Sequence, residues 1–439
     1  MSGGLRRELG LLPLAAVVFF NVSGGPYGIE DMVPSFGPGL TLLLLLVVPL
    51  LWSFPVALVM SELASAMPDE GGYVTWTTRA FGPFWGFQVG WWSWLDSFLD
   101  VAIYPALFVE YARFWWPGLG GVERWLLAFL FIIVLTGLNV AGVRPVGRAA
   151  VGLAVAALAP VAAFVVLGAG TMRMAPWTPL TAEGGSLFGG LGLGLAVVMW
   201  NYSGWDTPST VLGEVRAPER AFRGALWLAL PVVAAAYVLP MAVALGTGAL
   251  DWSRWTTGAL PLVAARVAGP WLGHAVAAGA VIATAGLFVS LLLTNSRLPY
   301  VLARAGGLPR WLGQVSPAFR TPVNAVTVSA AVYAACAVFS FRELIVLNVW
   351  LYSLSLVVEL AAFVWLRLRE PGLARPWRVP GGLATALLVA ALPTAFAALA
   401  MATAGWRNTA AGVATAITGP LVYRFSSMTR ARQSSVGSE

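Results

Sequence analysis

Acidic residues lie inside several long apolar segments of the chain, where ionisable side chains are costly and therefore usually functional. A buried carboxyl group can bind a proton near neutral pH, and a group of carboxylates attracts cations. Asp96 and Asp100 are four residues apart, so they share one helix face. The pattern favours a cationic ligand, a coupling proton, or both. The acidic residues in apolar segments are Glu30, Asp31, Glu62, Asp96, Asp100, Asp206, Glu214 and Glu359.

Basic residues are absent from much of the same interior. All 26 are Arg, and none lies within residues 149–172 or 343–366. Asp206 and Glu359 are therefore the strongest candidates for binding. Glu62 and Glu214, near predicted helix ends, are either gates or anchors. Glu30 and Asp31 either act in gating or brace the second half of the first helix.

A short sequence recurs in two apolar segments. Residues 18–24 read V-F-F-N-V-S-G and residues 198–204 read V-M-W-N-Y-S-G, followed by G-P-Y-G and W-D-T-P. Pro and Gly weaken a helix at these points, and freed backbone groups inside a membrane must line a polar cavity. Paired interruptions of this kind mark inverted-repeat transporters, with the substrate bound at the breaks. Kinks needed only for packing are the alternative.

The predicted binding site combines both breaks with the interior acids. Half-helix ends offer N–H groups to an anion and carbonyl groups to a cation. Aromatic rings near the second break could cover a bound ammonium group. The expected substrate-binding residues are Ser23, Gly24, Gly25, Tyr27, Gly28, Asp100, Trp200, Asn201, Ser203, Trp205, Asp206 and Glu359.

The elements that position these residues are apolar helices. The chain is 59% hydrophobic and 10% charged, and its apolar runs approach the ~20 residues that span a bilayer. We predict an all-α integral membrane protein of about twelve transmembrane helices in a 5+5 inverted repeat, with helices 1 and 6 broken. The predicted helices are 11–35, 39–66, 84–115, 122–141, 146–171, 187–214, 223–246, 271–304, 322–341, 343–368, 381–403 and 407–425.

These helices predict the organisation and orientation of the chain. The first repeat covers 1–171, the second 172–370, and two further helices 371–425, followed by a disordered cytoplasmic tail at 426–439. Most Arg residues fall in loops on the side of both termini, so the positive-inside rule places the termini in the cytoplasm and the chain in the cell membrane.

Other function classes have little support. The chain has one Cys and one His, so a metal centre, a disulfide and a Cys–His catalytic pair are not expected. No basic stripe suits nucleic acid, and no continuous polar stripe or charged ring suits a channel. We expect no enzymatic activity, no cofactor and no obligate protein partner.

Several motifs resemble the amino acid–polyamine–organocation superfamily. They are S-G-G-P-Y-G-I-E-D at 23–31, W-S-F-P-V-A-L-V-M-S-E-L-A at 52–64, G-G-Y-V-x-W at 71–76, A-F-G-P-F-W-G at 80–86, W-D at 205–206, L-G-E-V at 212–215 and R-P-W-R-V-P at 375–380. The chain is most similar to the polyamine:proton symporter group, known from plants, whose bacterial relatives are often described as amino acid permeases.

The resemblance implies two inverted five-helix repeats and a proton-coupled carrier of amino acids or polyamines that works by alternating access. Asp100, Asp206 and Glu359 fall where the polyamine group also has acidic residues. That group tends to carry an acidic residue after the Gly-Leu-Phe of helix 8, whereas residues 289–292 here are uncharged. The predicted fifth helix also lacks the Lys that some relatives use as a proton carrier.

Three forms of coupling therefore remain open. They are a carboxylate that carries a proton, a sodium ion near Thr284, Ser290 or Thr294, and exchange of one substrate for another. Candidates for coupling or gating are Glu30, Glu62, Asp96, Glu214, Thr284 and Ser290.

Overall fold

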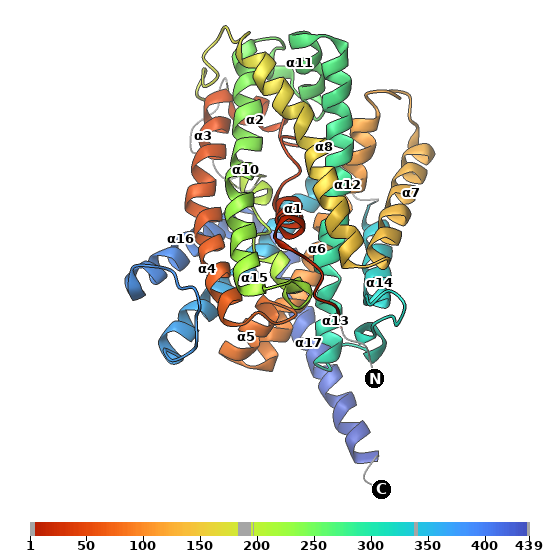
Figure 1. The fold of residues 1–439 in the computed structure, drawn as a ribbon, viewed down its shortest axis with the longest axis vertical. Helices are drawn as coiled ribbons and strands as arrows, with labels where there is room; N and C mark the ends of the chain where they lie inside the picture. Colours follow the sequence, from red (N-terminus) through yellow and green to blue (C-terminus); the bar gives the residue numbers. More distant parts are fainter. Residues whose placement is uncertain (1–4, 183–194, 196, 338–340, 437–439) are drawn as a thin grey trace.

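The computed structural model describes residues 5–182, 195, 197–337 and 341–436, and only the backbone for 341–347 and 427–436. Within these residues the chain is a bundle of helices, with one isolated bridge between Leu9 and Val215. Both termini lie at one end of the bundle, here called the terminal end, and α11 lies at the opposite end (Figure 1). The all-α prediction is confirmed.

The described part of every predicted span contains helix. The 3-10 and π turns are labelled η. The elements are α1 Leu11–Val22, α2 Met32–Phe36, α3 Pro38–Val48, η1 Pro49–Ser53, α4 Phe54–Ala66, α5 Tyr73–Phe81, α6 Pro83–Ala112, α7 Gly121–Val140, α8 Val143–Ala169, η2 Thr207–Glu214, α10 Pro218–Thr247, η3 Trp252–Arg254, α11 Ala259–Ala268, α12 Pro270–Asn295, α13 Arg297–Arg304, η4 Arg310–Gly313, α14 Val323–Cys336, α15 Phe341–Arg369, α16 Gly382–Thr403 and α17 Trp406–Val436.

Seven helices among the described residues are long and apolar enough to cross a membrane. The first predicted span is not one of them because its break leaves only short pieces, α1 and α2. The long helix α6 is not among the seven either. It carries Asp96 and Asp100 and is packed against α12 and α15, so less of its surface has to be apolar. Twelve crossings and the inverted repeat remain predictions.

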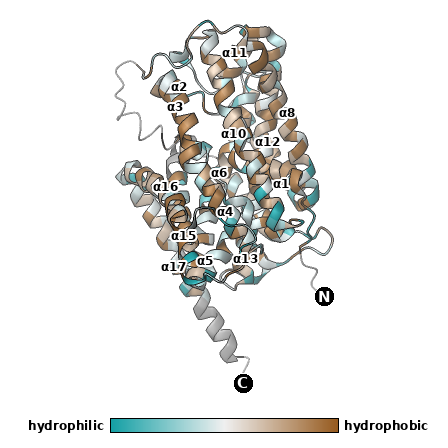
Figure 2. Ribbon diagram, turned by 60° about the vertical axis from the view of Figure 1, so that its left-hand side comes forward, coloured by the Kyte–Doolittle hydropathy of each residue, from teal (hydrophilic) through white to brown (hydrophobic). Residues whose placement is uncertain are grey.

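The outer surface suits hydrocarbon. On α7, the side chains of Leu126, Leu130, Ile133 and Val134 are exposed. Apolar residues also predominate along helices such as α3 and α8 (Figure 2). In contrast, α1 lies in the middle of the bundle, packed against α8, α10 and α12 (Figure 1). The break that follows α1 is therefore enclosed by protein.

The structure differs from the predictions at a few places. Two short helices, α5 and α11, occupy predicted connections, because each is too short to give the signal of a membrane span. The helix α17 continues to Val436, through most of the tail predicted to be disordered from residue 426; a formed helix is easily extended because each added residue gains a hydrogen bond. Residues 187–194 and 196 of the predicted sixth helix, 338–340 of the ninth and 437–439 of the tail lie outside the described residues.

Candidate functional site

The two helix breaks lie against each other in the middle of the bundle. Residues 23–31 separate α1 from α2, and residues 202–206 separate a helical segment from η2. Gly204 has a φ of 95°, and a Cβ atom there would collide with the carbonyl oxygen of Asn21. Gly is needed at this position for both its positive φ and its close approach. The breaks predicted in the first and sixth helices are thus confirmed.

Corresponding Asn residues of the recurring sequence make the same local contact. Asn21 Nδ2 donates to the Val17 carbonyl and Asn201 Nδ2 to the Val197 carbonyl, each at 2.8 Å. The two Asn side-chain oxygens have different donors. Thr294 Oγ1 donates to Asn21 Oδ1 at 2.7 Å. The Tyr237 hydroxyl lies 3.3 Å from Asn201 Oδ1 and 3.1 Å from the Asn201 backbone carbonyl. Both Asn side chains close the last helical turn before a break.

A cavity of about 30 Å³ lies where the breaks meet α6, α12 and α15. Such a volume holds about one water molecule, so this conformation is closed around the site. The lining residues are Asn21, Val22, Asp96, Ser97, Asp100, Tyr104, Trp200, Ser203, Gly204, Thr207, Leu291, Asn295, Asn348 and Tyr352.

Asp100 is held beneath two aromatic rings at one wall of this cavity. Trp200 Nε1 donates to Asp100 Oδ1 at 3.0 Å, and the Tyr104 hydroxyl donates to the same oxygen at 3.3 Å. The Tyr104 and Trp200 rings stack with centroids 6.5 Å apart. Trp200 thereby covers a carboxylate that an incoming cation would contact.

Two further acids are bonded to residues of α15: Asp96, which lines the cavity, and Asp206, which was predicted to bind substrate but does not line it. The Tyr352 hydroxyl donates to Asp206 Oδ1 at 2.5 Å and accepts the Gly204 N–H at 3.0 Å. Asn348 Nδ2 donates to Asp96 Oδ1 at 2.8 Å. Among the described residues, Asp96, Asp100 and Asp206 each have a neutral hydrogen-bond donor but no ion pair.

Glu359 lies on the same face of α15 as the cavity residues of that helix. Positions 348, 352, 355 and 359 follow the spacing of one helix face. Glu359 is 1% exposed, and within the described part of the chain neither carboxylate oxygen has a hydrogen-bond partner. It does not line the cavity, so its expected contact with substrate is absent in this closed conformation.

Several residues predicted from the first break lie away from the cavity. The Gly28 N–H donates to Glu30 at 2.8 Å and to the Tyr111 hydroxyl at 2.7 Å. Tyr111 donates to Glu30, and Gly258 N–H reaches it at 3.3 Å. Glu30 thus joins the break to Tyr111 of α6 and to Gly258, which precedes α11, and its role in gating or bracing remains a prediction. Thr257 Oγ1 donates to Asp31 at the same place.

Other residues of the first break are also in contact with protein groups. The Gly25 N–H donates to Ser23 Oγ at 3.0 Å. A Cβ on Gly24 would collide with Leu287, and the Tyr27 hydroxyl donates to the carbonyl of Ala157 at 3.4 Å. Among the predicted residues, Ser23, Gly24, Gly25, Tyr27 and Gly28 are thus absent from the cavity lining.

Trp205 also lies elsewhere than predicted. Its side chain is fully buried, and its indole N–H donates to the Tyr202 carbonyl at 2.8 Å. Of the two Trp residues predicted at the site, Trp200 lines the cavity and Trp205 does not. Asn201, the residue that follows Trp200, contacts Tyr237 and does not line the cavity.

The sequence analysis missed Asn21, Tyr104, Asn348 and Tyr352 as cavity residues. Two signals were present. Asn21 corresponds to Asn201 in the recurring sequence, and Tyr352 shares a helix face with Glu359.

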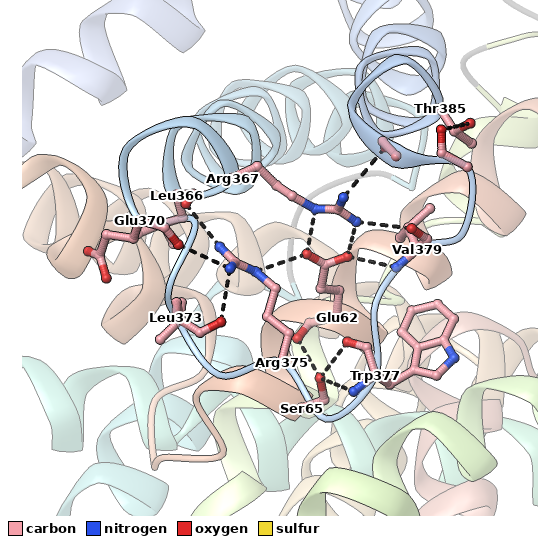
Figure 3. A network of polar contacts seen from close by, with 12 residues as sticks. Glu62, Ser65, Leu366, Arg367, Glu370, Leu373, Arg375, Trp377, Val379 and Thr385 are labelled. Carbon is pink, nitrogen blue, oxygen red and sulfur yellow. Dashed lines mark hydrogen bonds and ion pairs between the residues drawn. The ribbon is translucent and has the colours of Figure 1, made fainter.

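Glu62 is an anchor in a buried ion network at the terminal end (Figure 3). Arg367 Nε donates to Glu62 Oε1 at 2.6 Å, and Arg367 Nη2 pairs with Oε2. Arg375 Nε lies 3.1 Å from Oε1, and the Val379 N–H donates to Oε2 at 2.8 Å. The network joins α4 to the end of α15 and to the loop before α16.

Glu214 forms a second buried ion pair near the same end. Arg297 Nε lies 2.8 Å from Glu214 Oε1, and both side chains are almost fully buried. Glu70, in the connection between α4 and α5, lies close enough for the charges of Glu214 and Arg297 to act on it. Burial and the charge of Glu214 raise the pKa of Glu70 well above its usual range.

The hydroxyl groups of α12 that were predicted as sodium ligands do not form a cluster of oxygens. Thr284 Oγ1 donates to the Val281 carbonyl at 2.7 Å, inside its own helix. The residues of α12 that face Gly24 are Leu287 and Ala283, both apolar. Ser290 Oγ is buried without a hydrogen-bond partner in the described structure. The described part of the chain contains no group of three or more His, Cys, Asp or Glu residues able to hold a metal ion.

Residues 9–422 match the family model described as amino acid permease. The chain is 35% identical over 397 residues to the polyamine transporter PUT1 of Oryza sativa subsp. japonica, covering 90% of this chain and 74% of that protein. It is 34% identical over 397 residues to the polyamine transporter RMV1 of Arabidopsis thaliana, covering 90% and 80%. A probable polyamine transporter of Arabidopsis thaliana is 39% identical over 378 residues, covering 85% and 78%.

Proposed function

The chain belongs to the amino acid permease family and is a multi-pass membrane transporter, and from this premise we propose that it carries polyamines by proton-coupled symport. Movement would follow alternating access. The predicted helices 11–35, 39–66, 187–214 and 223–246 would rock against a scaffold that includes the predicted helices 84–115, 122–141, 271–304 and 322–341. Both termini would lie in the cytoplasm, consistent with the Arg distribution and with their common position in Figure 1.

The acidity of the closed cavity carries this proposal. Asp96 and Asp100 line one small space, and Asp206 lies just behind it, bonded to the lining residue Tyr352. No ion pair within the described residues neutralises these three carboxylates. A bound polycation would supply the missing charges, since buried charges are stable when paired. Trp200, whose indole N–H donates to Asp100, also brings an aromatic ring beside that carboxylate, and an ammonium group can bind to an aromatic face.

The first break favours polyamines over amino acids. An α-carboxylate would need free backbone N–H groups at a half-helix end. Ser23 already accepts the Gly25 N–H, and Glu30 and Tyr111 accept that of Gly28. The relatives above are named as polyamine transporters, which supports the same choice.

A proton is favoured over sodium as the coupling ion. Beside Gly24, α12 presents the apolar Leu287 and Ala283; Thr284 Oγ1 is bonded within its own helix and Thr294 Oγ1 to Asn21. These hydroxyl groups therefore do not form the set of several free oxygens that a hard cation requires. Exchange of one polyamine for another is the second candidate, and it is separated from symport by measuring net uptake.

The test uses purified protein in liposomes with labelled putrescine, spermidine and amino acids. We expect saturable polyamine uptake that follows an imposed proton gradient and ignores a sodium gradient. Asp206→Asn should weaken apparent polyamine affinity about tenfold to a hundredfold, since a hydrogen bond to a charged group contributes about 1.5–3 kcal/mol.

Asp251→Asn, at an exposed position outside the cavity, is the matched control and should transport like the unmodified protein. Uptake of amino acids alone would overturn the polyamine assignment. Wild-type affinity in Asp206→Asn would overturn the role of that carboxylate.

A further inference from the structure

Glu359 differs from every other acid around the cavity in having no donor at all. Asp96 is bonded to Asn348, Asp100 to Trp200 and Tyr104, and Asp206 to Tyr352. Both oxygens of Glu359 are buried and have no hydrogen-bond partner among the described residues. A charged carboxylate in that setting costs several kcal/mol, whereas a protonated carboxyl group carries no charge.

The charges that face Glu359 come from few elements. Asp206, at the second break, is the group whose charge acts on it. Tyr73 of α5 and Tyr352 of α15 both lie within range of its charge. Two of the neighbouring helices bring no charge to it: α16 has no titratable residue, and Glu62 of α4 is held by Arg367.

Two other helices packed against α15, α6 and α17, also carry titratable residues. The nearest acid of α6 is Asp96, which is bonded to Asn348. The described side chains of α17 include Arg407, Tyr423 and Arg424. None of these acts on Glu359 as Asp206 does.

The position of Glu359 suits a coupling group. It lies one helical repeat beyond Tyr352 on the same face of α15, and Tyr352 is the residue that bonds Asp206. Ser355, between the two on this face, also has a buried hydroxyl group without a partner in the described structure. A polar face of α15 therefore runs from the cavity to Glu359.

Resting on the function proposed above, we propose that Glu359 binds the coupling proton, while Asp100 and Asp206 bind the polyamine. One O–H bond forms on a Glu359 oxygen when the site faces the proton-rich side, and the same bond breaks when the site faces the other side. When Glu359 is protonated it is neutral, and Asp206 is then the charged carboxylate of this pair that can bind substrate. Proton and substrate thus bind neighbouring carboxyl groups and influence each other through the Asp206 charge.

The principal test is Glu359→Gln in liposomes with the membrane potential clamped to zero. Uptake driven by a proton gradient is expected to be lost, together with proton movement reported by a pH-sensitive dye on adding spermidine. Counterflow, which exchanges labelled for unlabelled spermidine without net proton movement, is expected to remain measurable. Glu370→Gln, at a half-buried position just beyond the same helix where the carboxylate is paired with Arg79, is the control and should keep full coupling.

Proton-driven accumulation by Glu359→Gln equal to that of the unmodified protein would overturn the proposal. If that variant does not fold, Glu359→Asp keeps the proposal testable. Infrared difference spectra on adding spermidine should then show a protonated-carboxyl band in the unmodified protein that shifts in Glu359→Asp. An unshifted band would exclude Glu359 as the proton site.

The two proposals fail in different ways. No polyamine uptake by the unmodified protein would remove the proposed function itself. Proton-driven uptake that survives Glu359→Gln would remove only the assignment of the proton to Glu359.

Discussion

The buried acids of the terminal end and those around the cavity have opposite surroundings. Glu62 and Glu214 are each paired with a buried Arg, at 2.6 Å and 2.8 Å. Asp100 and Asp206 are bonded to neutral Trp and Tyr donors. Paired charges can be buried in a resting structure, whereas unpaired ones are stable only with a ligand or proton. The pairing of a carboxylate, rather than its burial, separates anchoring acids from binding acids.

The largest effect is expected at the anchor. Arg367→Met leaves Glu62 buried with only part of its positive partners, and breaking a buried ion pair costs about 3–5 kcal/mol. Thermal unfolding in detergent should show a large decrease in stability. Replacing both Glu62 and Arg367 by Met should recover much of the loss, because no lone charge remains.

Arg378→Met in the same connection is the control for the anchor variant, because Arg378 is exposed. Equal stability of Arg367→Met and Arg378→Met would show that the network does not anchor the helices.

A smaller effect is expected at the cavity, on substrate affinity and not on stability. Asp100→Asn should lower spermidine affinity by about 1.5–3 kcal/mol, the contribution of a hydrogen bond to a charged group. Its stability without substrate should be unchanged or higher, because an unpaired buried charge has been removed. Binding is measured by thermal shift with increasing spermidine. A variant that unfolds as readily as Arg367→Met would place Asp100 with the anchors.

The smallest effect is expected at Glu70, an acid near the anchors that has no hydrogen-bond partner in the described residues. Because its folded pKa is raised, the protonated form favours folding, and the carboxylate destabilises the folded state as pH rises through the folded pKa. Glu70→Gln should therefore raise the melting temperature above that pKa. The difference should vanish below the unfolded pKa of about 4.3.

Melting curves across this pH range test the Glu70 prediction, with Glu123→Gln, on the exposed start of α7, as the control. A stabilisation by Glu70→Gln that is equal at every pH would contradict a titrating Glu70.

Local chemistry made part of the site predictable. Gly and Pro after Asn21 and Asn201 interrupt a helix wherever it packs, so both breaks were located from the sequence. The acids at positions 100 and 206 were recognised because charges inside apolar segments are rare. The aromatic cover was assigned to two Trp residues, and only Trp200 lies at the cavity, because the turn after the break directs Trp205 into the core.

The sequence by itself determined that the chain is helical, that it is apolar enough for a membrane, and where two helices are interrupted. These properties depend on residues that are neighbours along the chain. Tertiary structure alone decided which acids are paired, since Glu62 and Arg367 are separated by 305 positions and Asp206 and Tyr352 by 146. A carboxylate in an apolar segment is costly in either case, and only the packing of distant helices shows whether an Arg, a Tyr or no donor meets it.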